Sequence, residues 1–232
     1  MNKENLLRLS NILWDKSREL YGEIYENEDS FKDIMDYRQL HSKIVADLAV
    51  NMFDKYFLKL LGTADPAYRP SLYFACLIHD VRKLNKKHNL AGARFFLENQ
   101  GLLTSSLYDL QLVFCIVNYH SADKKGKDLE YINEIRNLSD DIKLLLLFTR
   151  LSDKLSKLVL KSHYKEISPE EVDMVLKKIN NNSKELLNFN DGISEILKEI
   201  EAIDNSISIM VNFSFLSTHI LSVSPDVFKL NG

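Results

Sequence analysis

The stretch from Tyr73 to Phe96 holds the residues in this chain that are best suited to chemistry. Six uncharged residues lead directly into the imidazole and carboxylate of the pair His79-Asp80. A second histidine, His88, follows within nine residues, after a basic segment. Imidazole and carboxylate groups together suit divalent ions such as Mn, Fe or Zn. The position of the pair at the end of an apolar run therefore indicates a buried metal site.

Three further ionisable residues, His41, His120 and Asp153, fall on apolar faces of separate expected helices when residues are placed about 100° apart. A single histidine in such a position is more often a hydrogen-bonded core residue than a ligand. A buried carboxylate is costly unless it is paired, hydrogen-bonded or bound to a metal. Helical bundles build metal sites from side chains on facing helices, so convergence of these residues in one core favours a metal centre.

The order of these residues resembles the H…HD…H…H…D pattern of the HD superfamily of metal-dependent phosphohydrolases. The local sequences are also similar to that family, namely HSKIVADLAVNMF, LIHDVRK, HNLAGARFFLE, IVNYHSAD and LSDKLSK. The LIHDVRK segment resembles the family's H-D-x-x-K motif. The resemblance spans about residues 35–160 and implies a bundle of helices around a metal centre.

The resemblance implies one or two divalent ions (Mn, Fe, Co, Mg or Zn) and assigns their ligands: His41, His79, Asp80 and Asp153 to the first, and His88, His120 and a bridging Asp80 to the second. A metal lowers the pKa of bound water and supplies hydroxide at neutral pH, and two ions about 3.5–4 Å apart also clamp phosphoryl oxygens. Asp80 and Lys83, from the H-D-x-x-K motif, are the predicted catalytic residues.

Basic residues crowd the predicted ligands, and four of them are expected to bind substrate phosphate: Arg82, Lys83, Lys124 and Arg150. The alternative is that these cations are solvated helix ends. Two departures from the family pattern stand out. Arg82 occupies a position where many relatives have a small residue. Lys83 stands where alarmone hydrolases carry an acidic pair, which argues against a guanosine-tetraphosphate hydrolase.

The expected function is hydrolysis of a phosphoester or phosphoanhydride bond in a small-molecule nucleotide by metal-activated water. In motif spacing the chain most resembles compact bacterial HD hydrolases that cleave dinucleoside polyphosphates. Two alternatives stay open, a catalytically silent nucleotide-binding or sensor module and an HD-type nuclease. All six ligand types are present, which favours an enzyme. The net charge of −3 argues against a nucleic-acid partner.

The elements that must position these residues are expected to be mainly helical, because 232 residues contain only 7 Gly and 4 Pro. We expect an all-α HD-domain bundle with a C-terminal helical extension and a short β segment. Loop-forming residues run from Gly62 to Pro70. The apolar periodicity places helices at about 4–26, 31–61 (interrupted or kinked), 71–81, 88–99, 105–120, 140–163, 169–181 and 192–203, and alternation places a strand at 206–215.

Three regions are expected, an N-terminal helical region at 1–34, an HD core at 35–163 and a C-terminal extension at 164–232. The extension is a candidate for a homodimer contact. His163 and His219 receive no role. No stretch is long and apolar enough for a membrane span, and no signal-peptide pattern opens the chain, so we expect a cytoplasmic protein with no membrane partner.

Overall fold

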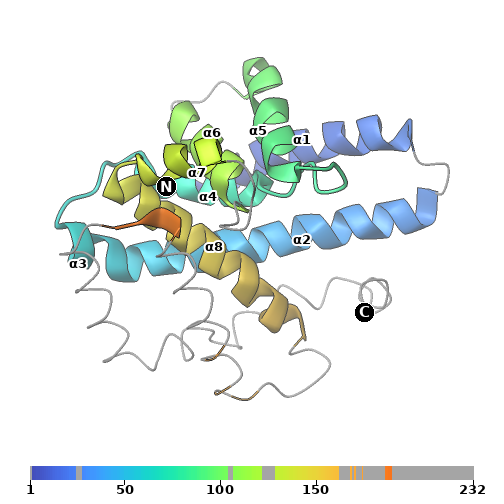
Figure 1. The fold of residues 1–232 in the computed structure, drawn as a ribbon. Coiled ribbons are helices and arrows are strands. Elements are labelled where there is room, and N and C mark those ends of the chain that lie inside the picture. The colour runs from blue at the N-terminus through green and yellow to red at the C-terminus, as the bar shows by residue number, and fades with distance from the viewer. Residues whose placement is uncertain are drawn as a thin grey trace.

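The structure is a computed structural model that describes residues 2–24, 28–103, 107–121 and 129–161, together with 168, 170, 174 and 186–189. The fold is an all-α bundle, as predicted, and its buried residues form a hydrophobic core shared by these helices (Figure 1). The helices of the described chain are α1 (Lys3–Gly22), α2 (Glu28–Met52), α3 (Leu58–Leu61), α4 (Tyr68–Ile78), α5 (His88–Glu98), α6 (Leu110–Tyr119), α7 (Leu129–Arg136) and α8 (Asp140–Lys161).

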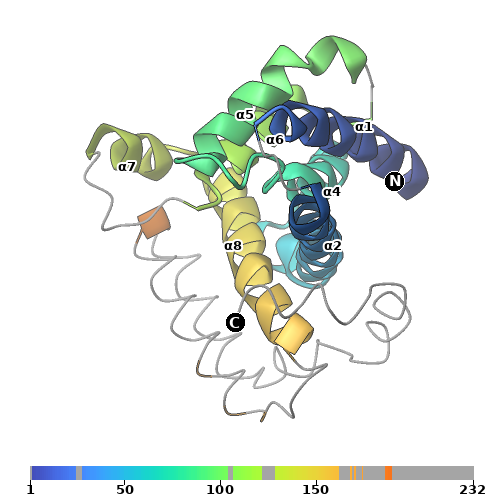
Figure 2. The same cartoon turned by 90° about the vertical axis from the view of Figure 1, so that its right-hand side faces the viewer.

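Helix α4 is the central element of the bundle. Every residue from Ser71 to Val81 is buried, which includes the His79-Asp80 pair just beyond the helix end. A helix that is apolar on all sides must be covered on all sides. The cover comes from α1, α2, α6 and α8, which all pack against α4 (Figure 2).

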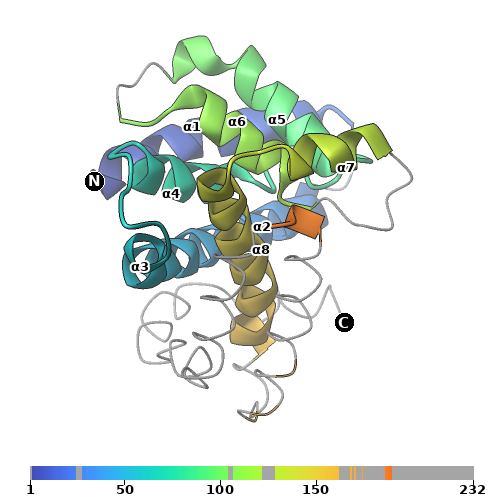
Figure 3. The ribbon, with the colours of Figure 1, turned by 60° about the vertical axis from the view of Figure 1, so that its left-hand side comes forward.

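Helices α2 and α8 form the long walls of the bundle and pack against each other at a crossing (Figure 3). Beyond Met52 the chain of α2 widens into a π-helix at Phe53–Phe57 and then continues as α3. This π-turn is the interruption expected within residues 31–61. Gly62, with φ of 74°, ends α3 in the left-handed conformation that glycine adopts without strain.

Several element boundaries differ from the sequence expectations. Helix α6 begins at Leu110 rather than near residue 105, because the Asp109 side chain caps it by accepting the Leu112 amide at 2.8 Å. Helix α4 begins at Tyr68, so Pro70 lies in its first turn, where no intrahelical amide bond is lost. Helix α7 was not predicted.

Several expectations fall wholly or mostly outside the described residues. They are the helices at 169–181 and 192–203, the strand at 206–215 and a homodimer contact through this extension. A short piece of the region is described, in which Leu186, Leu187 and Phe189 are buried. The Lys143 ammonium of α8 donates to the Asn188 carbonyl at 3.2 Å, which ties this piece to the bundle. Within the described chain, no helix has the length and apolar character of a membrane span.

Helix α1 holds the end of α4 in place. The last carbonyls of any α-helix lack intrahelical partners. The indole Nε1 of Trp14 donates to the Leu77 carbonyl at 2.9 Å, and the Ser17 hydroxyl donates to the Val81 carbonyl at 2.6 Å. Both hydrogen bonds are buried, and they lie on either side of His79-Asp80 in the sequence. The N-terminal helix thus fixes the backbone that presents this pair.

We predict that Trp14→Phe lowers the free energy of unfolding by about 1–3 kcal/mol, because a buried carbonyl loses its donor while most of the ring packing is kept. Denaturant unfolding followed by circular dichroism measures the change. Glu19→Ala, at an exposed position of the same helix, is the control and is expected to stay within about 0.5 kcal/mol of the wild type. Equal effects from both variants would contradict the anchoring role of the indole.

Candidate metal centre

The six residues expected to bind metal come together around the carboxylate of Asp80. Each comes from a different part of the bundle except the adjacent pair His79-Asp80 at the end of α4. His41 lies in α2, His88 begins α5, His120 follows the last residue of α6 and Asp153 lies in α8. Each of the four histidines has its Nε2 atom within 4 Å of an Asp80 carboxylate oxygen. The distances are 3.8 Å for His41, 3.6 Å for His79, 3.5 Å for His88 and 3.7 Å for His120.

Three of the histidines are held by hydrogen bonds at Nδ1. The Nδ1 atoms of His79 and His120 each lie 2.7 Å from a backbone carbonyl three residues earlier, those of Cys76 and Val117. A carbonyl only accepts, so these Nδ1 atoms carry a hydrogen. His41 Nδ1 lies 3.0 Å from the Ser156 hydroxyl, which itself donates to the Asp153 carbonyl. In each neutral ring the remaining Nε2 atom therefore presents a lone pair.

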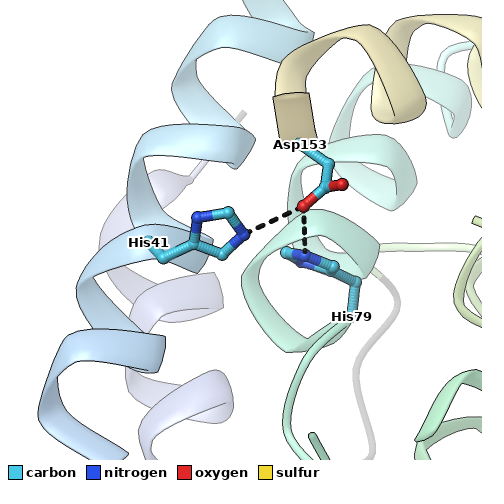
Figure 4. Close-up of side chains that lie close together, drawn as sticks. All are labelled: His41, His79 and Asp153. Carbon is cyan, nitrogen blue, oxygen red and sulfur yellow. Dashed lines mark hydrogen bonds and ion pairs between the residues drawn. The ribbon is translucent and has the colours of Figure 1, made fainter. Parts of the chain in front are cut away.

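These lone pairs face carboxylate oxygens instead of donors. The Nε2 atoms of His79 and His120 and Oδ2 of Asp80 are buried, and no hydrogen-bond partner is found for them among the described residues. His41 Nε2 and Asp153 Oδ1 are 3.1 Å apart, and Figure 4 shows the same oxygen directed at both His41 and His79. Buried polar atoms in folded proteins are nearly always satisfied. Converging acceptors without donors fit a bound cation.

The spacing of these atoms also fits a metal ion. Bonds of about 2.1 Å to four ligands in a tetrahedron place the ligand atoms about 3.4 Å from one another. The Nε2 atoms of His41 and His79 lie 3.1 and 3.9 Å from Asp153 Oδ1, on either side of that value. Two overlapping groups have ligand atoms close enough to share an ion: His41, His79 and Asp153, and His79, Asp80 and His120. A divalent ion is therefore compatible with residues on α2, α4 and α8.

The protonation states suit a cation site. Burial would raise the pKa of both Asp80 and Asp153, but neighbouring groups outweigh it, and both pKa values lie well below the usual range. For Asp80 these groups include His79 and Lys83. Burial lowers the pKa of His41 and of His120. Burial, with the proximity of His120 and Lys83, lowers the pKa of His88 to about 4. Ionised carboxylates and neutral imidazoles are the forms that bind metals.

His79 behaves differently from the other histidines. Burial acts to lower its pKa, but the carboxylates of Asp80 and Asp153 outweigh burial and raise the pKa. In the absence of another cation, a proton on His79 Nε2 offsets part of the negative charge. A metal ion and this proton compete for the same lone pair.

The predicted phosphate-binding residues are placed differently from one another. Lys83 joins the cluster, with its Nζ 3.0 Å from Asp80 Oδ1. The Arg82 guanidinium instead packs over the rings of Tyr21 and Phe95, at 4.1 and 5.2 Å from their centroids. Arg150 donates to the His120 carbonyl at 3.2 Å, which supports the backbone of a ligand. Lys124, like His163 and His219, lies outside the described residues.

The structure adds Arg38, a cation that the sequence did not place at the site, and it brings Lys154 and Lys157, two of the basic residues that flank Asp153 in the sequence, close to that carboxylate. Arg38 Nη1 lies 3.9 Å from Asp80 Oδ2, and Lys154 and Lys157 lie 3.1 and 3.9 Å from Asp153 Oδ2. With Lys83 they form a group that we call the cationic collar. Arg38 precedes His41 by three residues in α2, so helical spacing alone places the two on one face. That spacing was the signal that could have identified it.

Comparison with protein-family models, with curated proteins and with solved structures found no match.

We predict that metal affinity rises with pH and levels off above the pKa of His79. The raised pKa means that the ring holds a proton at a higher pH than an ordinary histidine, and a metal must displace that proton. Calorimetric titration with Mn²⁺ in buffers of different ionisation enthalpy measures the proton released. Metal should also raise the melting temperature. Binding that is independent of pH between 5.5 and 8, with no proton release, would contradict this assignment.

Proposed function

We propose that this protein is a metal-dependent phosphohydrolase that acts on a nucleotide. The observation that carries the proposal is the combination of a buried group of metal-type ligands with a surplus of positive charge beside it. The two carboxylates Asp80 and Asp153 have four cationic side chains within 4 Å, those of Arg38, Lys83, Lys154 and Lys157. A divalent ion would increase this surplus, so an anionic substrate fits the site best.

The collar is suited to contact substrate because two of its members reach solvent further than the ligands do. The side chains of Lys154 and Lys157 are 47% and 43% exposed, whereas that of Asp153 is 14% exposed and that of Asp80 is fully buried. A phosphate group entering from solvent would meet the collar first and then the carboxylates and imidazoles. The Nε atom of Arg38 is buried without a hydrogen-bond partner among the described residues, and a phosphate oxygen that reached the cluster would supply an acceptor.

Each group has a distinct role in the proposed reaction. His41, His79, Asp80 and Asp153 would hold the ion, with His120 and His88 adjacent. A divalent ion supplies hydroxide at neutral pH and polarises a phosphoryl oxygen. Arg38 and Lys83 would orient the phosphoryl group and stabilise negative charge on its oxygens. This assignment agrees with the resemblance of the sequence to HD-family hydrolases. The alternative, a sensor module, would bind nucleotide without turnover.

The direct test is a hydrolysis assay on metal-stripped protein reloaded with Mn, Fe, Co, Mg or Zn. The panel includes nucleoside monophosphates, cyclic dinucleotides and dinucleoside polyphosphates. Asp80→Asn should reduce kcat/KM at least about a hundredfold, since even loss of an outer partner of a metal ligand costs ten- to hundredfold. Arg38→Gln should reduce kcat/KM about tenfold, equivalent to about 1.4 kcal/mol, while metal content stays at the wild-type level.

Arg94→Gln is the matched control, because Arg94 is an exposed arginine of α5. It should leave kcat/KM within about twofold of the wild type. Nucleotide binding without turnover under every metal would instead support the sensor alternative. An Arg38→Gln variant that hydrolyses nucleotides as fast as the Arg94→Gln variant would contradict the role of the collar.

A further inference from the structure

Lys83 lies where a second metal ion would be expected. The resemblance of the sequence to HD hydrolases assigns Asp80, His88 and His120 to that ion. The Lys83 ammonium donates to Asp80 Oδ1 at 3.0 Å and lies 3.2 Å from His88 Nε2. It therefore bridges two of the three ligand atoms that a second ion would need.

Without the ammonium, those ligand atoms are spaced for an ion. The Nε2 atoms of His88 and His120 lie 3.5 and 3.7 Å from Asp80 Oδ1. Ligands of one ion with bonds of about 2.1 Å are separated by about 3.0–3.4 Å. A small contraction would complete the second position, so its geometry does not exclude a metal. The Lys83 ammonium occupies this second position.

The pattern of satisfied and unsatisfied atoms separates the two positions. His88 Nε2 has a donor in Lys83, whereas the Nε2 atoms of His79 and His120 have no hydrogen-bond partner among the described residues. Both candidate metal groups in the described chain leave out His88. At the second position Lys83 thus pairs with His88 Nε2 and Asp80 Oδ1, and of its three ligand atoms only His120 Nε2 lacks a hydrogen-bond partner among the described residues.

The charges near the cluster also oppose a second dication. Asp80 and Asp153 supply two negative charges, which one divalent ion neutralises. A second ion beside Asp80 and His88 would lie against the Lys83 ammonium, whose Nζ is 3.0 Å from Asp80 Oδ1. Like charges at such distances in a partly buried site repel strongly.

We propose that the centre holds one metal ion and that the Lys83 ammonium takes the place of the second. This inference rests on the proposed function and specifies it. The ammonium offers a phosphoryl oxygen one positive charge and its N–H donors, where a second ion would offer coordination. His88 then serves as an acceptor that orients Lys83, and not as a metal ligand.

The test compares metal stoichiometry in four forms of the protein, stripped and then loaded with Mn²⁺. Elemental analysis gives the number of ions per chain, and electron paramagnetic resonance distinguishes an isolated Mn²⁺ from an exchange-coupled pair. The wild type should bind one ion and give an isolated signal. Lys83→Met, which removes the charge from a chain of similar shape, should bind two ions and give a coupled signal.

Two further variants complete the design. Lys83→Arg keeps the positive charge and should bind one ion. Lys83→Met combined with His88→Ala lacks a ligand for the second ion and should return to one. Circular dichroism confirms that each variant is folded, and Lys83→Gln replaces Lys83→Met if the methionine variant does not fold.

Two outcomes would overturn the inference: two ions in the wild type, or one ion in the folded Lys83→Met or Lys83→Gln protein. Neither would remove the proposed function, which needs at least one ion. A wild type that binds no metal under any loading condition would instead contradict the proposed function itself.

Discussion

The arrangement of this bundle depends on one electrostatic constraint. Imidazole lone pairs and two ionised carboxylates face one another in a largely buried cluster. Hydrogen bonds to the Cys76 and Val117 carbonyls fix His79 and His120 with Nε2 turned toward Asp80. Buried acceptors without donors destabilise a fold unless a cation satisfies them. The cluster is thus stable in this form only together with a cation, whether a proton on His79, the Lys83 ammonium or a metal ion.

The helices around the cluster can be understood as the means of holding it. The apolar helix α4 must be covered on all sides, and three of the four helices that cover it, α2, α6 and α8, bring other ligands. Helix α1 carries no ligand, yet Trp14 and Ser17 satisfy carbonyls on both sides of the His79-Asp80 pair. Burial of α4 and delivery of the pair into the centre are therefore consequences of the same packing.

The sequence was sufficient to predict the helical class, most helix positions and the residues that converge, because these follow from periodicity and from polar residues on apolar faces. It did not identify where flexible cations point. Arg82 and Lys83 are adjacent, yet Arg82 stacks on Tyr21 while Lys83 joins Asp80. The chain leaves α4 through consecutive turns, including the Lys83 amide to Asp80 carbonyl hydrogen bond, so helical geometry no longer predicts side-chain direction there. The short distance between Arg38 and Asp80 became evident only from the tertiary structure.

The most direct test of this account is the anomalous scattering of crystals grown with Mn²⁺ and measured near the manganese absorption edge. The account predicts a peak bounded by His41, His79, Asp80 and Asp153, at distances of about 2.0–2.3 Å from their nitrogen and oxygen atoms. No peak at this position in well-diffracting crystals with Mn²⁺ in excess would contradict the central claim. So would a peak bound elsewhere while the His79 Nε2 atom stays without a partner.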